Sequence, residues 1–214
     1  MQLYYHPVSS YSQKTVMAFH EKNLKFTPEI VDIMDPAGRG DYKKINSLGK
    51  VPTLVLDDGW RIPESSIIIE YIDGHFPESG TRLIPGDRDR GRQTRFFDRL
   101  ADLYVNEMMT TIFFDGRKPP EARNPAAVKH AKETLDTMLG NFDAHLGKHT
   151  PWIMGGDFTM ADCSVAPALG YMRLVHPFDA HKNVAAYFQR LVERPSFKRV
   201  LDEAAPYLAA MTAK

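Results

Sequence analysis

The sequence predicts a small α/β domain followed by an all-α domain. Short β-prone runs alternate with helically spaced apolar residues in the first part of the chain, as far as Phe76. The next segment, Pro77–Asp89, is dense in proline, glycine and charge, as interdomain linkers are. Beyond Pro85 no strand-like run stands out, and apolar residues recur at the 3.6-residue spacing of a helix.

The first half of the α/β domain is expected to pair two strands around a helix. Leu3–Tyr5 is β-prone, and the apolar spacing from Ser12 to Asn23 predicts a helix. Phe26–Val31 alternates like a second strand. Pro28 interrupts it, and because proline lacks the N–H that a central strand needs, this strand is expected at a sheet edge. A loop at Asp35–Gly40 and a short helix at Tyr42–Ile45 are expected to follow.

The second half of this domain is predicted to be a hairpin and a helix. Thr53–Leu56 and Trp60–Ile62 are β-prone, and the Asp58-Gly59 pair between them is typical of a tight hairpin turn. A helix over Ile67–Phe76 follows, with a serine hydroxyl near its start as an N-cap. The order β-α-β-α-β-β-α mixes a parallel crossover with an antiparallel hairpin, which is the arrangement of a thioredoxin-like domain.

The rest of the chain is expected to be helical. The pattern Thr159–Asp162 has the form of a capping box before a helix, so Asp162 is expected to act in folding and not in catalysis. We place a thioredoxin-like domain at 1–78, a linker at 79–89 and an all-helical domain at 90–214. The apolar stripes that predict its helices are Phe96, Phe97, Leu100, Tyr104 and Met108; Ala127, Ala131, Leu135, Met138 and Phe142; Val165, Ala168 and Met172; Val184, Tyr187, Phe188 and Leu191; and Phe197, Val200, Leu201 and Ala204.

The composition of the chain argues against nucleic-acid-binding, membrane-spanning and secreted, disulfide-rich proteins. Lysine and arginine number 27, as do aspartate and glutamate, so the chain carries no electrostatic footprint for nucleic acid. No apolar run approaches the about 20 residues that span a membrane. The N-terminus lacks the basic and apolar regions of a signal peptide. The single cysteine, Cys163, excludes an internal disulfide and fits a reducing compartment. We therefore expect a cytoplasmic protein with no nucleic-acid and no membrane partner.

One stretch carries a resemblance to a known family. Val51-Pro52 stands immediately before a predicted strand, and Glu64-Ser65 stands at the start of the helix after the hairpin. This combination resembles the glutathione site of cytosolic glutathione S-transferases, and the two-domain pattern of the glutathione transferase fold extends the resemblance over nearly the whole chain. In that family the Val-Pro bond is cis. The backbone of Val51 would then pair with the tripeptide glutathione by strand addition.

The resemblance also assigns glutathione contacts. A helix N-terminus presents unpaired N–H groups and a partial positive charge, so Ser65 would bind the γ-glutamyl carboxylate. Glu64 would pair with the α-ammonium of the same ligand. Lys50 precedes Val51, where a basic residue in the family often reaches the glycyl carboxylate, here as a point charge. The implied co-substrate is glutathione.

The segment Pro7–Phe19 resembles the Pro-x-Ser segment of the serine-type, bacterial-like members. The first serine of that segment faces the thiol of glutathione, which maps onto Ser9, with Ser10 and Ser12 as alternatives one and three residues away. A hydroxyl that donates to the thiolate lowers the thiol pKa without itself attacking. Two departures from the family pattern, Ser10 and Lys14, leave the subfamily open.

The second substrate is expected to be an electrophilic, partly apolar small molecule that docks between the domains. Several helical-domain residues would form its site, and some of them are expected to be ordinary core. The candidates are Tyr104, Met108, Ile112, Phe113 and Arg117, the last for an acidic group.

We expect a glutathione transferase that acts as a homodimer. A glutathione-dependent isomerase or an ether-cleaving enzyme stays open as an alternative, because the serines and the stretch before Val51 look similar to both. A noncatalytic binding protein that keeps the fold is the alternative from another class. No metal is expected, since Gly147 and Pro151 make a helix end the better interpretation of the His145–His149 spacing.

Overall fold

The computed structural model describes residues 1–33 and 35–212, which form two compact units. The first comprises residues 1–84 together with the C-terminal segment from Pro195, and the second comprises residues 85–194. Among the described helices, none combines the length and the apolar composition that a membrane crossing requires.

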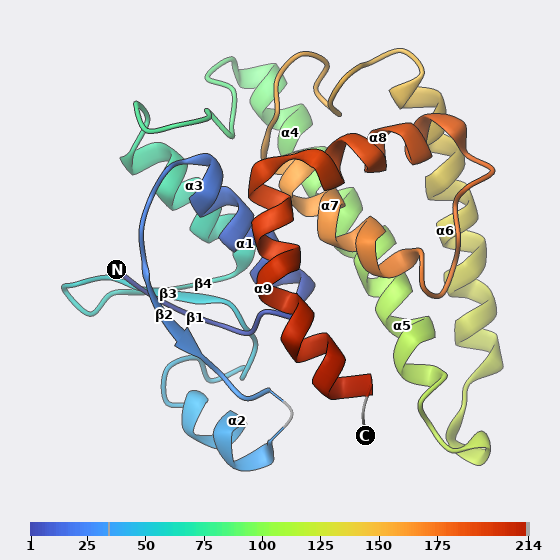
Figure 1. The fold of residues 1–214 in the computed structure, drawn as a ribbon, viewed down its shortest axis with the longest axis horizontal. Helices are drawn as coiled ribbons and strands as arrows, with labels where there is room; N and C mark the ends of the chain where they lie inside the picture. Colours follow the sequence, from blue (N-terminus) through green and yellow to red (C-terminus); the bar gives the residue numbers. More distant parts are fainter. Residues whose placement is uncertain (34, 213–214) are drawn as a thin grey trace. The chain divides into compact units, whose positions relative to one another are not determined.

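The first unit is built on a four-stranded mixed sheet in the order β2-β1-β3-β4 (Figure 1). Strands β1 and β2 are parallel, and the pairs β1-β3 and β3-β4 are antiparallel. Helices α1 and α3 cover one side of the sheet and α2 lies on the other (Figure 1). In chain order the elements are β1 (Gln2–Tyr5), α1 (Ser10–Glu21), β2 (Thr27–Ile30), α2 (Pro36–Tyr42), β3 (Thr53–Val55), β4 (Arg61–Pro63) and α3 (Ser65–His75).

The sequence predictions for this sheet are confirmed. Strand β2 lies at an edge, and its Pro28 pairs with Leu3 of β1. The turn between β3 and β4 places Gly59 at φ +87°, a conformation that favours glycine. Leu3, Leu54 and Ile62, at the centres of three strands, are buried in the core.

Helix α2 begins earlier than the sequence predicted. The expected loop at Asp35–Gly40 is mostly helix, and the helix expected at Tyr42–Ile45 ends at Tyr42. The carboxylate of Asp35 accepts a hydrogen bond from Gly38 N at 3.0 Å, and Pro36 occupies the first helical position, where its missing N–H costs nothing. Gly38 and Gly40 disfavour a helix, but the Asp35-Pro36 start signal prevails over them.

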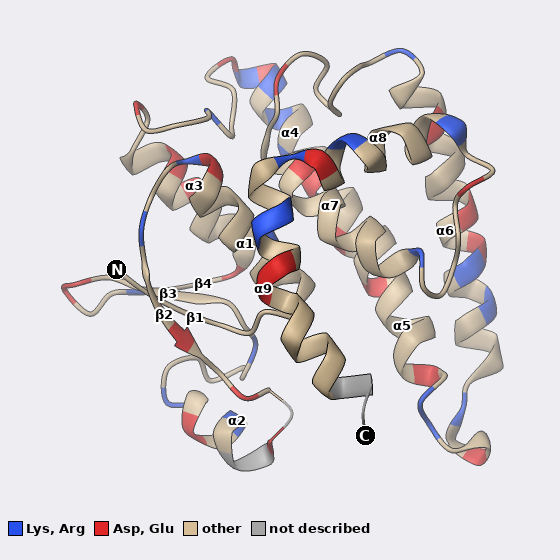
Figure 2. Ribbon diagram, in the orientation of Figure 1, with Lys and Arg blue, Asp and Glu red and all other residues tan. Residues whose placement is uncertain are grey.

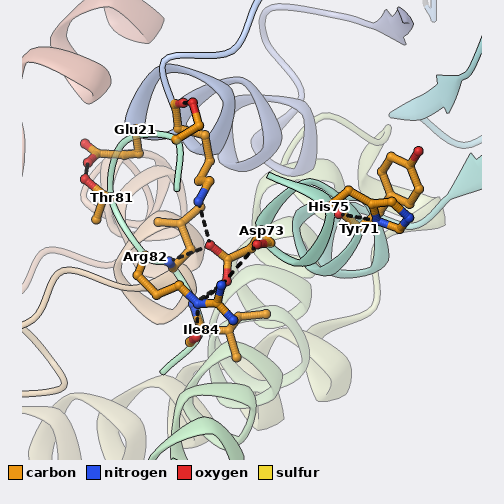
Figure 3. A network of polar contacts seen from close by, with 10 residues as sticks. Glu21, Tyr71, Asp73, His75, Thr81, Arg82 and Ile84 are labelled. Atoms are coloured by element: carbon orange, nitrogen blue, oxygen red, sulfur yellow. Dashed lines mark hydrogen bonds and ion pairs between the residues drawn. The ribbon is translucent and has the colours of Figure 1, made fainter. Parts of the chain in front are cut away.

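A buried charge network fixes the segment that follows α3 (Figure 3). The carboxylate of Asp73, 1% exposed, accepts hydrogen bonds from the backbone N–H groups of Leu83 and Ile84 at 2.9 and 3.1 Å. It also pairs with Lys22 Nζ at 3.1 Å and Arg82 Nε at 3.2 Å. Two cations and two amides therefore offset the cost of burying this carboxylate.

Helix α9 (Pro195–Thr212) follows the second unit in sequence, yet it packs on α1 of the first. The hydroxyl of Tyr5 donates to the carboxylate of Glu203, and Ser196 donates to Glu21 at the end of α1. These contacts place α9 with the sheet. The domain boundaries expected from the sequence, with a linker at 79–89, stay a prediction.

The second unit is all-helical, as predicted. Helix α7 lies at its centre, and nearly all of its residues are buried. The capping box is confirmed, since Asp162 Oδ2 accepts a hydrogen bond from Thr159 N at 2.8 Å. The elements are α4 (Arg88–Leu100), the π-helical η1 (Ala101–Asn106), α5 (Glu107–Asp115), the short 3-10 turn η2 (Pro120–Ala122), α6 (Pro125–Leu146), α7 (Met160–Met172) and α8 (Lys182–Glu193).

The apolar stripe that predicted the helix through residues 96–108 is not its buried face. Phe96 is 56% exposed and Tyr104 is 47% exposed, whereas Thr94, Asp98 and Val105 are buried. Ser164 on α7 donates a hydrogen bond to Asp98, so a polar residue can face the core there. Hydrophobic spacing alone could not reveal this pairing, because its partner lies 66 residues away.

Candidate functional site

Three segments singled out in the sequence meet at one end of the sheet. Strand β1 runs toward this end and leads into the loop that precedes α1. Strand β3 is antiparallel to β1 and therefore starts at the same end, and β4 is antiparallel to β3 and ends there. The register aligns Tyr4, Thr53 and Pro63 across the three strands. The loop after β1, the turn before β3 and the start of α3 thus share one edge.

The turn before β3 is fixed from behind by side chains. The peptide bond between Val51 and Pro52 is cis, as the resemblance implied. The carbonyl of Lys50 accepts hydrogen bonds from Tyr42 Oη at 2.8 Å and from Asn46 Nδ2 at 2.9 Å. Within the described chain, the backbone N–H and C=O of Val51 make no hydrogen bond, and the exposed Lys50 ammonium has no ion-pair partner. The turn therefore offers backbone groups and one cation.

The start of α3 has an unusual backbone. Glu64 occupies the N-cap position at φ 73°, a region that costs a residue with a side chain about 1–3 kcal/mol. The expected hydroxyl cap is absent, because no side chain caps α3, and Ser65 is instead its first residue. The hydroxyl of Ser66 accepts a hydrogen bond from Lys14 Nζ at 2.8 Å, which links α3 to α1. With no side chain capping it, this helix start can receive an anion.

Ser9 is the N-cap of α1. Its Oγ accepts a hydrogen bond from Ser12 N at 3.4 Å, and its hydroxyl hydrogen has no acceptor among the residues described. Ser10 is the first residue of the helix and is half-buried. Ser12 is fully buried, and its Oγ accepts a hydrogen bond from His6 N at 3.3 Å. Ser9 and Ser10 are both half-buried, and among the described residues both hydroxyls can still donate, so Ser9 differs from Ser10 only in its N-cap position.

Comparison with known proteins agrees with this arrangement. Residues 8–75 match the family model described as glutathione S-transferase, N-terminal domain, and residues 122–190 match the one described as glutathione S-transferase, C-terminal domain. The chain belongs to the glutathione S-transferase family. Its fold, a thioredoxin-like unit with an all-α unit, is the one the sequence predicted. The serine-type subclass stays a prediction.

Relatives in this family are similar along most of their length. Glutathione S-transferase A of Pleuronectes platessa is 28% identical over 193 residues, which cover 87% of this chain and 80% of that protein. A stringent starvation protein A homolog of Coxiella burnetii is 30% identical over 209 residues, which cover 95% and 92%. A crystal structure of a glutathione S-transferase from Methylobacillus flagellatus with GSH bound has a TM-score of 0.85 and 28% identity, covering 93% and 98%.

Two residues shortly before Ser9 in the chain, Tyr5 and His6, were not among the site residues predicted from the sequence. Tyr5 is buried and donates its hydroxyl to Glu203, and both burial and that bond raise the Tyr5 pKa above its usual range. That hydroxyl is therefore already used within the fold. His6 has three hydrogen bonds, to Val8 and Ser9 in the loop and to Ser12 in α1. The only sequence signal was its position, directly after a strand and two residues before Val8.

The residues expected to bind the electrophile lie in the second unit. Tyr104 is in the π-helical segment η1, and Met108, Ile112 and Phe113 are half-buried on α5. The guanidinium of Arg117 lies 3.7 Å from the centre of the Phe113 ring, a cation–π contact that holds the charge beside an aromatic face. Their role in binding stays a proposal.

Histidines 145 and 149 are explained by packing. Their rings stack at 4.3 Å, and His145 Nε2 lies 2.8 Å from the carbonyl of Ile153. Burial lowers the pKa of His145, so the ring is neutral and donates this bond. Across residues 1–33 and 35–212, no group of three or more His, Cys, Asp or Glu side chains is arranged to hold a metal ion.

Proposed function

We propose that this protein is a glutathione transferase that activates the thiol of glutathione for attack on an electrophilic, partly apolar small molecule. The supporting observation is the shared sheet end, where the Ser9 loop, the Val51-Pro52 turn and the start of α3 meet. These segments supply a hydroxyl donor, an unpaired stretch of backbone and an anion-binding helix start. A tripeptide with a carboxylate at each end and a thiol between them complements all three.

Each part of glutathione then has a partner. The peptide backbone pairs with the N–H and C=O of Val51 as an added strand. Lys50 attracts the glycyl carboxylate. Ser65 receives the γ-glutamyl carboxylate through its N–H and hydroxyl, with the partial charge of the α3 dipole behind them. Glu64 pairs with the α-ammonium group.

Ser9 acts on the thiol. A free thiol has a pKa of about 8.5, so only a few per cent is thiolate at neutral pH. A hydroxyl that donates to the thiolate contributes about 1.5–3 kcal/mol, and the nearby N-terminus of α1 contributes about 0.3–1 kcal/mol. Since about 1.4 kcal/mol corresponds to one pKa unit, the bound thiol pKa falls by about one to three units. Most of the bound glutathione is then thiolate.

The chemistry is a substitution or an addition. The thiolate sulfur forms a bond to the electrophilic carbon, and a leaving group departs with its electron pair in the substitution case. The thiol proton goes to solvent when the thiolate forms. Tyr104, Met108, Ile112 and Phe113 contribute apolar surface for the electrophile, and Arg117 selects an acidic substituent. The same thiolate would serve a glutathione-dependent isomerase or an ether-cleaving enzyme, which are the alternatives within this class.

The second candidate is a noncatalytic protein that keeps this fold. Similarity to the stringent starvation protein A homolog extends over 95% of the chain, so family membership alone does not decide for catalysis. The intact set of Ser9, Val51-Pro52 and Glu64-Ser65 favours the enzyme.

One experiment separates these candidates. We expect the protein to be retained on immobilised glutathione and to conjugate a chlorinated nitrobenzene. In Ser9→Ala the pKa of bound glutathione should rise by about one unit or more, with nearly unchanged affinity. Ser10→Ala is the control at the neighbouring hydroxyl. Retention without turnover of any electrophile in a panel would favour the noncatalytic protein, and a Ser10→Ala effect in place of the Ser9→Ala effect would reassign the hydroxyl.

A homodimer is part of this proposal. On α4 the exposed side chains of Arg92, Phe96 and Arg99 recur at the spacing of one helical face, and Leu103 of η1 continues it with 41% exposure. Figure 2 shows in blue that α4 carries basic residues. Aromatic and arginine side chains of this kind are enriched at protein interfaces. A second copy of the chain is the partner that the family suggests. A cytoplasmic location stays a prediction.

A further inference from the structure

His6 makes three hydrogen bonds with the loop that carries Ser9 and with the first turn of α1. Its carbonyl oxygen accepts a hydrogen bond from Ser9 N at 2.9 Å. Its own backbone N–H donates to Ser12 Oγ at 3.3 Å. Its ring nitrogen Nδ1 accepts a hydrogen bond from Val8 N at 3.2 Å. A side-chain acceptor of His6 therefore helps to hold the backbone immediately before Ser9.

The bond from Val8 requires one protonation state of the ring. Nδ1 accepts only when it carries no proton, so the imidazole is neutral with its hydrogen on Nε2. Burial lowers the pKa of His6, and the opposing effect of Asp32 is the smaller of the two. The ring also packs edge-to-face against Tyr207 of α9 at 5.4 Å. The contact with Tyr207 and the bond from Val8 thus fix the position of the His6 ring, and burial keeps the ring neutral.

We propose that His6 is a positioning residue for thiol activation: its neutral Nδ1 holds Val8 so that the Ser9 hydroxyl is aimed at the bound thiol. This inference rests on the proposed function. The geometry of the bond from Val8 N to His6 Nδ1 shows which side chains could replace histidine. The bond links residue 6 to the N–H of residue 8, which is the same i to i+2 bond that asparagine makes in an Asx turn. An asparagine can replace this acceptor, and a phenyl ring cannot.

Two substitutions at residue 6 separate positioning from packing. His6→Asn keeps an acceptor for Val8 but loses the ring contact with Tyr207. His6→Phe keeps a ring against Tyr207 but has no acceptor. We expect His6→Phe to raise the pKa of the bound glutathione thiol by about one unit, and His6→Asn to leave it near the wild-type value. Thermal stability should change in the opposite order, with His6→Asn the less stable variant.

The thiolate absorbance of bound glutathione, followed against pH, measures this pKa. The same titration in the Ser9→Ala background tests whether His6 acts through Ser9. There we expect His6→Phe to add little, because the hydroxyl that it would misplace is gone. His6→Gln provides a second variant without an acceptor at the Nδ1 position if His6→Phe does not fold. Amide hydrogen exchange at Val8 should be faster in His6→Phe and His6→Gln than in His6→Asn.

The outcomes separate this inference from the function on which it rests. If the wild-type protein forms no thiolate from bound glutathione, the proposed function fails and the positioning role fails with it. If the wild type forms thiolate but His6→Phe and His6→Gln leave its pKa unchanged, only the positioning role is overturned. A larger pKa rise in His6→Asn than in His6→Phe would also overturn it, since packing would then be the property that matters.

Discussion

Gly80 lies where the segment after α3 passes against the C-terminal end of α1. Its φ is +58°, and a Cβ built on it would lie 2.2 Å from the carbonyl oxygen of Glu21. Both the backbone conformation and the space therefore require glycine at this position. Thr81 continues the contact, because its N–H donates to the same carbonyl at 2.8 Å. The charge network around Asp73 then fixes the end of the segment (Figure 3).

A substitution at this residue is expected to be severe. Gly80→Ala should lower the free energy of unfolding by about 3 kcal/mol or more, because the new Cβ would force backbone against backbone. Gly86→Ala is the matched control, since a Cβ there meets nothing within 4 Å. Its effect should stay within about 1 kcal/mol. Urea unfolding of the two variants measures the difference, and similar losses in both would contradict the close approach at Gly80.

At the scale of elements, the start of α7 depends on one buried carboxylate. Asp162 accepts hydrogen bonds from the N–H groups of Ile153 and Thr159 and from the hydroxyl of Tyr187. Burial raises the pKa of Asp162 to about 6, and these hydrogen bonds only partly oppose the rise. The capping box therefore joins α7 to α8 and to the loop before it, but at the cost of burying a charge.

The sign of the resulting pH dependence follows from these values. The pKa of this carboxyl rises from its ordinary value of 3.8 in the unfolded chain to about 6 in the folded protein, so the folded protein holds the proton more tightly between these two pH values. The contribution of Asp162 to stability is therefore lost as the pH rises through this window, by at most about 3 kcal/mol. Asp162→Asn should remove this slope and lower stability overall. The exposed Asp179→Asn is the control, and an unchanged slope in Asp162→Asn would refute the assignment.

At the scale of the whole molecule, the proposed homodimer makes a prediction about mass. Sedimentation should give twice the chain mass of 24.3 kDa. Phe96→Glu should shift the protein toward monomer, because it puts a charge at the centre of the exposed face that Arg92, Arg99 and Leu103 surround. Phe114→Glu is the matched control, since Phe114 is 54% exposed and Phe96 is 56% exposed. A monomeric wild type, or equal effects of both variants, would refute this interface.

Much of the fold was predictable from the sequence because its signals are local. The period-2 and period-3.6 patterns, the Asp58-Gly59 turn, Pro28 at the sheet edge and the capping box at Thr159 each act within a few residues. The candidate site was predictable as three motifs, since Ser9, Val51-Pro52 and Glu64-Ser65 are each short. The Asp35-Pro36 start signal of α2 is just as local, yet Asp35–Gly40 was expected to be a loop.

Only the tertiary structure decided what depends on distant partners. The antiparallel register of β1, β3 and β4 brings the three motifs to one sheet end, although they lie about 40–55 residues apart along the chain from Ser9. Packing against α7 turned the polar face of α4 inward, and contacts with Tyr5 and Glu21 placed α9 beside the sheet. His6 became a candidate only once its ring was seen to hold Val8. Local propensity determines which elements form, but burial and pairing between segments far apart in sequence determine which faces meet.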